Sequence, residues 1–371
     1  MVPGDEGSAL EIRNVTDAVA IEDVDFYSRD ATATGGSSIA AIIENAENVR
    51  LAHIWILAGG AMAGDEGVSG ANGIDAAEFS GQQQGARASC STGWTLQPGG
   101  SWWEDNFCGS RGGSGGPSQE GYEGFPGSAG LPRSNVVAQN PEDLDNGGSE
   151  GPEGADGKAG APGLSGAPGQ VADDGAFTAL GFTPALAGGA GTNGFPGQGG
   201  GGGGASNATG ACIGASGGAG GMGGCGGKRG TGGSAGGASV ALLVWSSAVT
   251  LDACELIAQE GGNGGKGGDG GLGGLGKDGA IGGAAFTDAS TSVGKGGNGG
   301  PGGNGGVGGP GAGGNGGPSI ALVFHGTAPE GVASSVLTAG IAGEAGPGGS
   351  AGALVAEDGR AGTASAQLSV P

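Results

Sequence analysis

Short apolar segments with the length and partial alternation of β-strands recur along the chain, separated by long stretches that are almost free of apolar side chains. Three of these segments resemble one another: SIAAII at 38–43, SVALLV at 239–244 and SIALVF at 319–324. The first two are followed by similar second segments from Val49 and Val249, and no stretch has a convincing helical period. The pattern predicts strand–turn–strand modules and essentially no α-helix.

The two ends of the chain also predict strands. Between Ala9 and Ser28 the apolar positions largely alternate; they are Leu10, Ile12, Val19, Ile21, Val24 and Phe26. Residues 364–370 read as a closing strand. Unpaired strand edges are templates for pairing, so we expect 9–28 to join a neighbouring copy head to tail. The alternative is that it forms an ordinary end layer of its own chain, in which case the closing strand is the next candidate contact.

Glycines spaced three apart fill the stretches between the apolar segments. Gly296 to Gly317 is an unbroken run of eight such glycines, and similar runs start at Gly148, Gly218 and Gly261. A period of three matches the polyproline-II conformation, and a face of hydrogen atoms lets another backbone approach closely. We therefore expect polyglycine-II helices packed side by side. The tracts concerned are 194–204, 217–237, 261–283 and 294–318, with reversals at Asn, Pro or Lys positions.

The amino-acid composition distinguishes this architecture from collagen. The chain has 101 glycines but only 17 prolines in 371 residues, and most runs read GGx. The predicted fold class is all-β and irregular, with β-solenoid-like strand modules alternating with packed polyglycine-II helices. We expect three regions: a β-rich segment at 1–73, an acidic aromatic insertion at 74–147, and glycine-rich modules at 148–371.

The net charge limits the class of partner, and the cysteines indicate the cellular location. The net charge of −23 argues against nucleic acid as a partner and is compatible with weak calcium binding. No transmembrane span or signal peptide is visible, so a secreted chain would have its leader outside this sequence. We expect disulfides Cys90–Cys108 and Cys212–Cys225, with Cys254 unpaired and Cys225–Cys254 as the rival. Short-range disulfides favour an extracellular or cell-surface location.

Residues for catalysis are scarce. The GxSxG matches occur at the frequency expected by chance in so much glycine, and no phosphate-binding loop is present. The two histidines, His53 and His325, lie in apolar segments and are expected to be buried structural residues rather than metal ligands. We expect no enzyme, no cofactor and no metal site.

Tryptophans cluster near the first cysteine loop. Trp94, Trp102 and Trp103 lie within 90–108. A local core beneath a disulfide is the first interpretation, and an exposed platform for sugars or a partner is the second.

The GGx tracts, the GGCGG around Cys225 and the strand-plus-VTL motif at 239–283 resemble glycine-rich secreted proteins of social and predatory deltaproteobacteria. The tracts are more loosely similar to polyglycine-II domains of phage tail-fibre adhesins and of a springtail antifreeze protein. The resemblance implies a secreted location and a type of architecture, but it implies no activity. We expect a self-assembling extracellular filament or surface-layer subunit; the alternatives are an adhesin that binds surface glycans, and an ice-binding protein.

Overall fold

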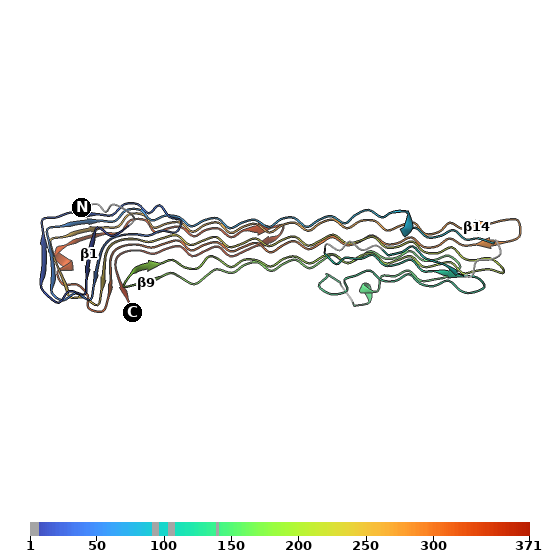
Figure 1. Ribbon diagram of the computed structural model, residues 1–371, viewed down its shortest axis with the longest axis horizontal. Helices are drawn as coiled ribbons and strands as arrows, with labels where there is room; N and C mark the ends of the chain where they lie inside the picture. Colours follow the sequence, from blue (N-terminus) through green and yellow to red (C-terminus); the bar gives the residue numbers. More distant parts are fainter. Residues whose placement is uncertain (1–6, 91–95, 103–107, 139–140) are drawn as a thin grey trace.

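A computed structural model describes residues 7–90, 96–102, 108–138 and 141–371. The molecule is elongated, with a block of small parallel sheets at one end and long irregular tracts running to the other (Figure 1). The first described strand, β1 (Leu10–Arg13), and the C-terminus lie at the sheet end (Figure 1). The described chain is essentially non-helical and strand-rich, as the apolar pattern predicts.

The largest sheet is parallel and contains the three similar apolar segments as adjacent central strands. Its order is β1 (Leu10–Arg13), β4 (Ser38–Glu44), β11 (Ser239–Trp245), β16 (Ser319–His325) and β20 (Ala364–Val370). The segments align residue for residue, because Ser239 pairs with both Ser38 and Ser319. Each of the three central strands is almost wholly buried, which explains their near-continuous apolar sequence.

Two further parallel sheets complete the block. One has the order β12 (Val249–Asp252), β5 (Val49–Ala52), β2 (Val19–Glu22), and the other β17 (Val336–Thr338), β13 (Glu255–Ile257), β6 (Trp55–Leu57), β3 (Phe26–Tyr27). The strands β1–β3, β4–β6 and β11–β13 form three successive repeats, and each repeat supplies one strand to each of the three sheets in the same order. The segment 9–28 supplies β1, β2 and β3, so it is an end layer of its own chain, which is the alternative stated above.

Corners between the sheets are turned by residues in the left-handed region. Asn14, Asn45 and Ser246 turn equivalent corners with φ of 55°, 46° and 49°, and His53 (φ 50°) turns a later one. Asn adopts this conformation more readily than most residues, so two of these positions have a local reason. The expectation of a buried His53 is wrong: its side chain is 62% exposed and its Nδ1 lies 3.9 Å from Asp23.

The core lies between the three sheets. Its fully buried members include Ile43, Leu51, Ile56, Leu242 and Leu322, which come from three segments of the chain that are far apart in sequence. A second apolar layer covers the outer face of the large sheet, where Phe177 and Phe182 of a short hairpin pack. That hairpin is β9 (Ala176–Thr178) and β10 (Gly181–Thr183).

The remaining elements are short. The strands are β7 (Leu96–Gln97), β8 (Ser118–Gln119), β14 (Phe286–Thr287), β15 (Ser292–Val293), β18 (Ser350–Ala351) and β19 (Leu354–Val355). The 3-10 helices are η1 (Gly81–Gln83), η2 (Pro141–Leu144) and η3 (Val332–Ser334). The hairpins β14–β15 and β18–β19 reverse the chain at the distal ends of their excursions, so the expectation of reversals at Asn, Pro or Lys within the tracts is wrong.

The glycine-rich tracts are neither helix nor strand, isolated bridges aside. They are 58–80, 154–170, 187–205, 214–238, 258–285, 294–318, 339–349 and 356–363. Backbone hydrogen bonds join neighbouring tracts at every third residue. Between tracts 214–238 and 294–318 the donor–acceptor pairs are Gly218–Gly297, Gly221–Gly300, Gly224–Gly303, Gly227–Gly306 and Gly230–Gly309, at 2.9–3.0 Å. Tracts of both relative directions are joined in this way.

The acidic region 74–147 shares this bundle. Ile74 and Ala76 extend the hydrogen-bond series of tract 58–80, because Cys225 donates to Ile74 and Ala76 donates to Leu275. Farther on, Gly113 donates to Gly200 of tract 187–205 at 2.8 Å. Much of the region expected to be an insertion therefore packs directly on the glycine tracts.

Candidate functional site

The disulfides tie distant segments together rather than closing short loops. The pairs are Cys90–Cys212 and Cys108–Cys225, with sequence separations of 122 and 117. The expected pairing, Cys90–Cys108 and Cys212–Cys225, is wrong, although the same four cysteines are used. Cys254 is a buried free thiol, as expected. Its thiol donates to the carbonyl of Leu51 in the core, and the other four cysteines are paired with one another. The two disulfides indicate an oxidising environment.

One aromatic residue of the expected platform is described. Trp102 is 47% exposed, and the guanidinium carbon of Arg111 lies 4.6 Å from its ring centroid. This is the geometry of a cation–π contact. Trp94 and Trp103 lie outside the described residues. Arg111 is anchored by paired backbone hydrogen bonds with Leu131, so the Trp102 ring sits against a fixed segment of the bundle.

Side-chain oxygens on the bundle surface accept backbone N–H groups of neighbouring tracts. Ser69, Asn72 and Asp75 of the first excursion are spaced three apart. They accept from the backbone N–H groups of Asp269, Leu272 and Leu275 at 3.3, 2.9 and 2.7 Å. Sequence reasoning missed this role. The signal was present, because polar residues recur at every third position from Ser69 to Asp75.

Side-chain oxygens also accept backbone N–H groups beyond the point where a neighbouring tract ends. Gly261, Gly264 and Gly267 donate to carbonyls of tract 339–349, and Gly270 donates to Ser350 where that tract meets β18. Farther along, the N–H groups of Gly276 and Gly282 instead reach Asn304 and Asn298 Oδ1, at 3.0 and 2.9 Å. The asparagine side chain thus supplies the hydrogen-bond acceptor that a backbone carbonyl of tract 339–349 supplies at Gly261, Gly264 and Gly267.

Two aspartates illustrate the electrostatic effect of these contacts. The backbone N–H of Ser350, with help from the ammonium group of Lys266, lowers the pKa of Asp269 below its ordinary value. The backbone N–H groups of Ser290 and Thr291 lower the pKa of Asp288 in the β14–β15 turn. Both carboxylates are favoured in the charged form because N–H donors point at them.

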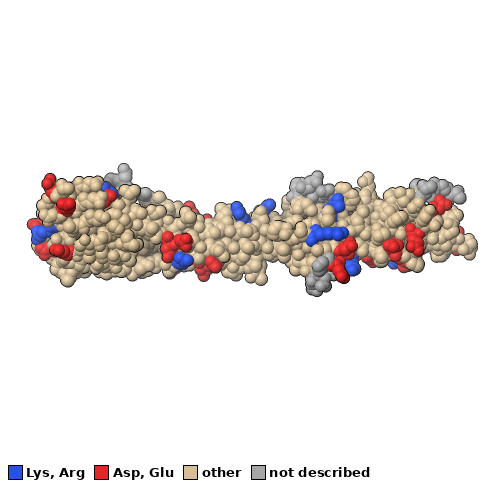
Figure 2. All heavy atoms as spheres, turned by 90° about the horizontal axis from the view of Figure 1, so that it is seen from below, with Lys and Arg blue, Asp and Glu red and all other residues tan. Residues whose placement is uncertain are grey.

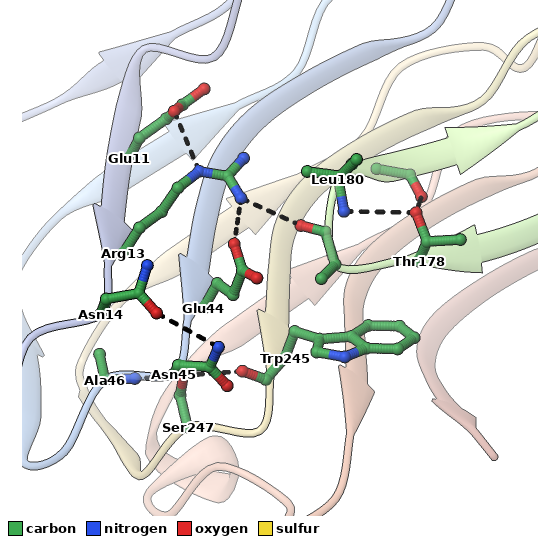
Figure 3. A network of polar contacts seen from close by, with 12 residues as sticks. Glu11, Arg13, Asn14, Glu44, Asn45, Ala46, Thr178, Leu180, Trp245 and Ser247 are labelled. Atoms are coloured by element: carbon green, nitrogen blue, oxygen red, sulfur yellow. Dashed lines mark hydrogen bonds and ion pairs between the residues drawn. The ribbon is translucent and has the colours of Figure 1, made fainter.

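The residues expected to make the assembly contact face the protein's own core. Ile12 and Phe26 are buried, and Leu10, Val19 and Ile21 pack against the same cluster. Val24 is 38% exposed. Arg13 on β1 is held by Glu11, by Glu44 and by the carbonyl of Ala179 at 3.3 Å (Figure 3). The side chains of β1 are thus already engaged within one chain.

Strand β20 forms the opposite edge of the large sheet. Its sequence, ASAQLSV, has no charged residue, and four of its seven side chains are exposed. Beside it is a pocket of about 460 Å³, lined by Phe177 and Phe182 of the hairpin and by Ile320, Leu368 and Val370 of the sheet. Arg360 and Asp174 form an ion pair at its rim, at 3.2 Å.

Charged side chains form separate patches along the molecule, and much of the face in Figure 2 carries none. In the part of the chain that the structure describes, no three His, Cys, Asp or Glu side chains gather as metal ligands. The weak calcium binding considered from the composition stays a prediction. His325 is half-buried and stacks on Trp245 with ring centroids 4.3 Å apart.

No helix within the described ranges is long and apolar enough to cross a membrane. Comparison of the chain with protein-family models, with curated proteins and with solved structures found no match.

Proposed function

We propose that this protein is an extracellular structural element, the rod-shaped subunit of a self-assembling filament or surface layer. The proposal rests chiefly on one observation: neighbouring glycine tracts are bonded to one another by backbone hydrogen bonds at every third residue. We further propose that the tracts are polyglycine-II helices and that the sheet block is a short β-solenoid.

The hydrogen-bond pattern favours this conformation. A polyproline-II helix satisfies none of its own backbone groups, so its N–H and C=O groups must bond outside it. With three residues per turn, successive N–H groups point in three different directions around the helix axis. In tract 258–285, Gly261 donates to Ile341, Gly262 to Gly237, and Asp269, in the third series, to the Ser69 hydroxyl. Each tract is thereby bonded to several neighbours at once.

Such a bundle is rigid because any displacement of one tract breaks bonds to several others. The adjacent tracts 58–80 and 258–285 also carry exposed aliphatic side chains: Val68, Ile74, Leu272, Leu275 and Ile281, each more than half exposed. Exposed apolar rows mark interaction surfaces. A stiff rod with such a row suits side-by-side packing in an ordered assembly.

Negative-stain electron microscopy of the purified chain tests the proposal. The expected result is uniform fibres or an ordered layer whose repeat changes when the row is made polar, as in a Leu272→Asn, Leu275→Asn variant. An Asp278→Asn variant on the same tract is the matched control. Single dispersed rods at all concentrations would overturn the proposal.

A recognition role is the second candidate, favoured by the exposed Trp102 ring beside Arg111. Aromatic faces bind sugar rings and other flat apolar surfaces. A glycan array probed with wild type and with Trp102→Ala tests it. Tyr122→Ala, at a residue that is 62% exposed, serves as the control. Identical array profiles for wild type and Trp102→Ala would exclude Trp102 as the platform.

A further inference from the structure

Strand β20 has the features of an edge that pairs with another chain. Edge strands usually carry charges, prolines or bulges that block pairing, or they are very short. β20 is seven residues long and has neither a charge nor a proline. The opposite edge, β1, has four residues, and its Arg13 is tied to Glu11 and Glu44. The two edges of the sheet are therefore not equivalent.

Two core-facing positions of β20, Gln367 and Ser369, are polar where every earlier strand of the sheet is apolar. Leu242 pairs with Leu322, and Leu322 pairs with Gln367 of β20. In the next column Val244 pairs with Phe324, and Phe324 pairs with Ser369. Gln367 and Ser369 are both exposed. A strand added beside β20 therefore meets polar side chains on this face.

We infer that β20 is where a second copy of this chain joins the sheet, as an antiparallel β20–β20 pair related by a two-fold axis. The inference rests on the proposed self-assembly and names its first contact. Residues on the same face lie opposite one another across an antiparallel pair, so Gln367 and Ser369 of the two copies share one polar seam.

Pairing with β1 of the next copy fits less well. Along the sheet, Leu10 and Ile12 of β1 occupy the columns that end in Gln367 and Ser369. A β20–β1 contact in the same register would place these apolar residues against the polar pair. It would also align only four residues of β1 instead of up to seven. Antiparallel pairing is in addition slightly more stable per residue.

Charge restricts where two copies can approach. With a net charge of −23, two chains repel one another wherever acidic patches meet. β20 is an uncharged strip, and its outward side chains Leu368 and Val370 line the pocket beside Phe177 and Phe182. In a two-fold pair, Leu368 and Val370 of the second copy fall on this same outer face, which enlarges the apolar surface there.

The test is sedimentation velocity of the full chain from about 10 to about 200 µM, with a Gln367→Lys, Ser369→Lys variant. Two-fold symmetry places the added charges of both copies in the same seam, where like charges repel. The expected wild-type mass approaches twice 34.1 kDa with rising concentration, and the variant stays at 34.1 kDa. A Thr209→Lys, Ala211→Lys variant adds the same charge in the loop after tract 187–205 and should behave like the wild type.

Hydrogen exchange gives a second readout that does not depend on mass. Amides of 364–370 should exchange at least tenfold more slowly at high concentration in the wild type, and show no such change in the Gln367→Lys, Ser369→Lys variant. A wild type that stays monomeric, or a variant that still dimerises, overturns the inference. Masses that grow beyond the dimer in both proteins alike overturn it too, while leaving the structural role intact. A dimer that forms no fibres supports the β20 contact and counts against the filament.

Discussion

Asn304 Oδ1 accepts the backbone N–H of Gly276 at 3.0 Å, beyond the point where tract 339–349 has ended. A side chain of one tract thereby satisfies a donor whose equivalents in Gly261, Gly264 and Gly267 bond to a third tract. An N–H group left without an acceptor is costly, so the position of this asparagine has a direct physical reason.

Asn304→Ala should therefore loosen the bundle locally. We expect a loss of about 1 kcal/mol, the usual effect of leaving one backbone donor without its partner. The measurement is hydrogen exchange at the Gly276 amide, which should become several-fold faster. Asn304→Asp keeps the accepting oxygen and should retain most of the protection. Equal protection in wild type and Asn304→Ala would show that the contact contributes nothing.

Gly305→Ala should separate two tracts. A Cβ at this position would lie 2.0 Å from the carbonyl oxygen of Cys225 and 2.5 Å from its carbon, so the backbone itself must move. We expect destabilisation of about 3 kcal/mol or more, at the upper end for overpacking. Thermal unfolding followed by circular dichroism measures it. Gly81→Ala is the control, since nothing lies within 4 Å of its Cβ position. A Gly305→Ala protein as stable as Gly81→Ala would contradict the packing described.

Peptide mapping without reduction should recover fragments that link Cys90 to Cys212 and Cys108 to Cys225. Each disulfide closes more than a hundred residues, so the chain-entropy model assigns it about 4–5 kcal/mol. A Cys108→Ser, Cys225→Ser variant should therefore unfold at markedly lower denaturant than the wild type. A fragment that links Cys90 to Cys108 would contradict this connectivity.

Acid should weaken the contact between Asp269 and Ser350. The pKa of Asp269 is lowered in the folded protein, so its contribution to stability is present above the unfolded pKa of about 4 and is lost as pH falls through the folded value. We expect the amide of Ser350 to lose protection below about pH 4, after correction for intrinsic exchange. Asp269→Asn keeps an accepting oxygen without titrating, and should show a smaller change. Asp278→Asn on the same tract is the control; identical acid profiles in all three proteins would refute the assignment.

Ile12→Ala should cost about 3 kcal/mol, because Ile12 is buried in the core and its removal leaves a cavity. Val24→Ala, at a position that is 38% exposed, should cost well under 1 kcal/mol. Chemical denaturation of both variants makes the comparison. If 9–28 served only a neighbouring copy, Ile12→Ala would leave the isolated monomer as stable as the wild type.

Strand positions were predictable because they depend on local patterning. The repeats at 38–43, 239–244 and 319–324 become β4, β11 and β16 in one sheet, and the closing segment becomes β20. Burial on both faces selects near-continuous apolar runs, and such runs are visible without any structure. The period of three likewise marked the tracts as neither helix nor ordinary strand.

Cysteine pairing and the histidine environments were not predictable in this way. Cys90 lies near Cys108 in sequence, yet the excursions bring Cys212 to the first and Cys225 to the second. His53 sits in an apolar segment, but it occupies a left-handed corner that turns its side chain to solvent. Both the disulfide pairs and the exposure of His53 depend on how distant segments of the chain align with one another, and local sequence does not encode that alignment.

The sequence by itself determined the repeating units: short apolar strands, glycine at one or two of every three positions in the tracts, and a strongly acidic composition. Only the tertiary structure decided which units are neighbours, and with them the disulfide pairs, the asparagines that replace missing backbone, and the placement of 9–28 as an end layer. The physical reason is that periodicity acts within one strand or tract, whereas hydrogen bonds between tracts join residues far apart in the chain.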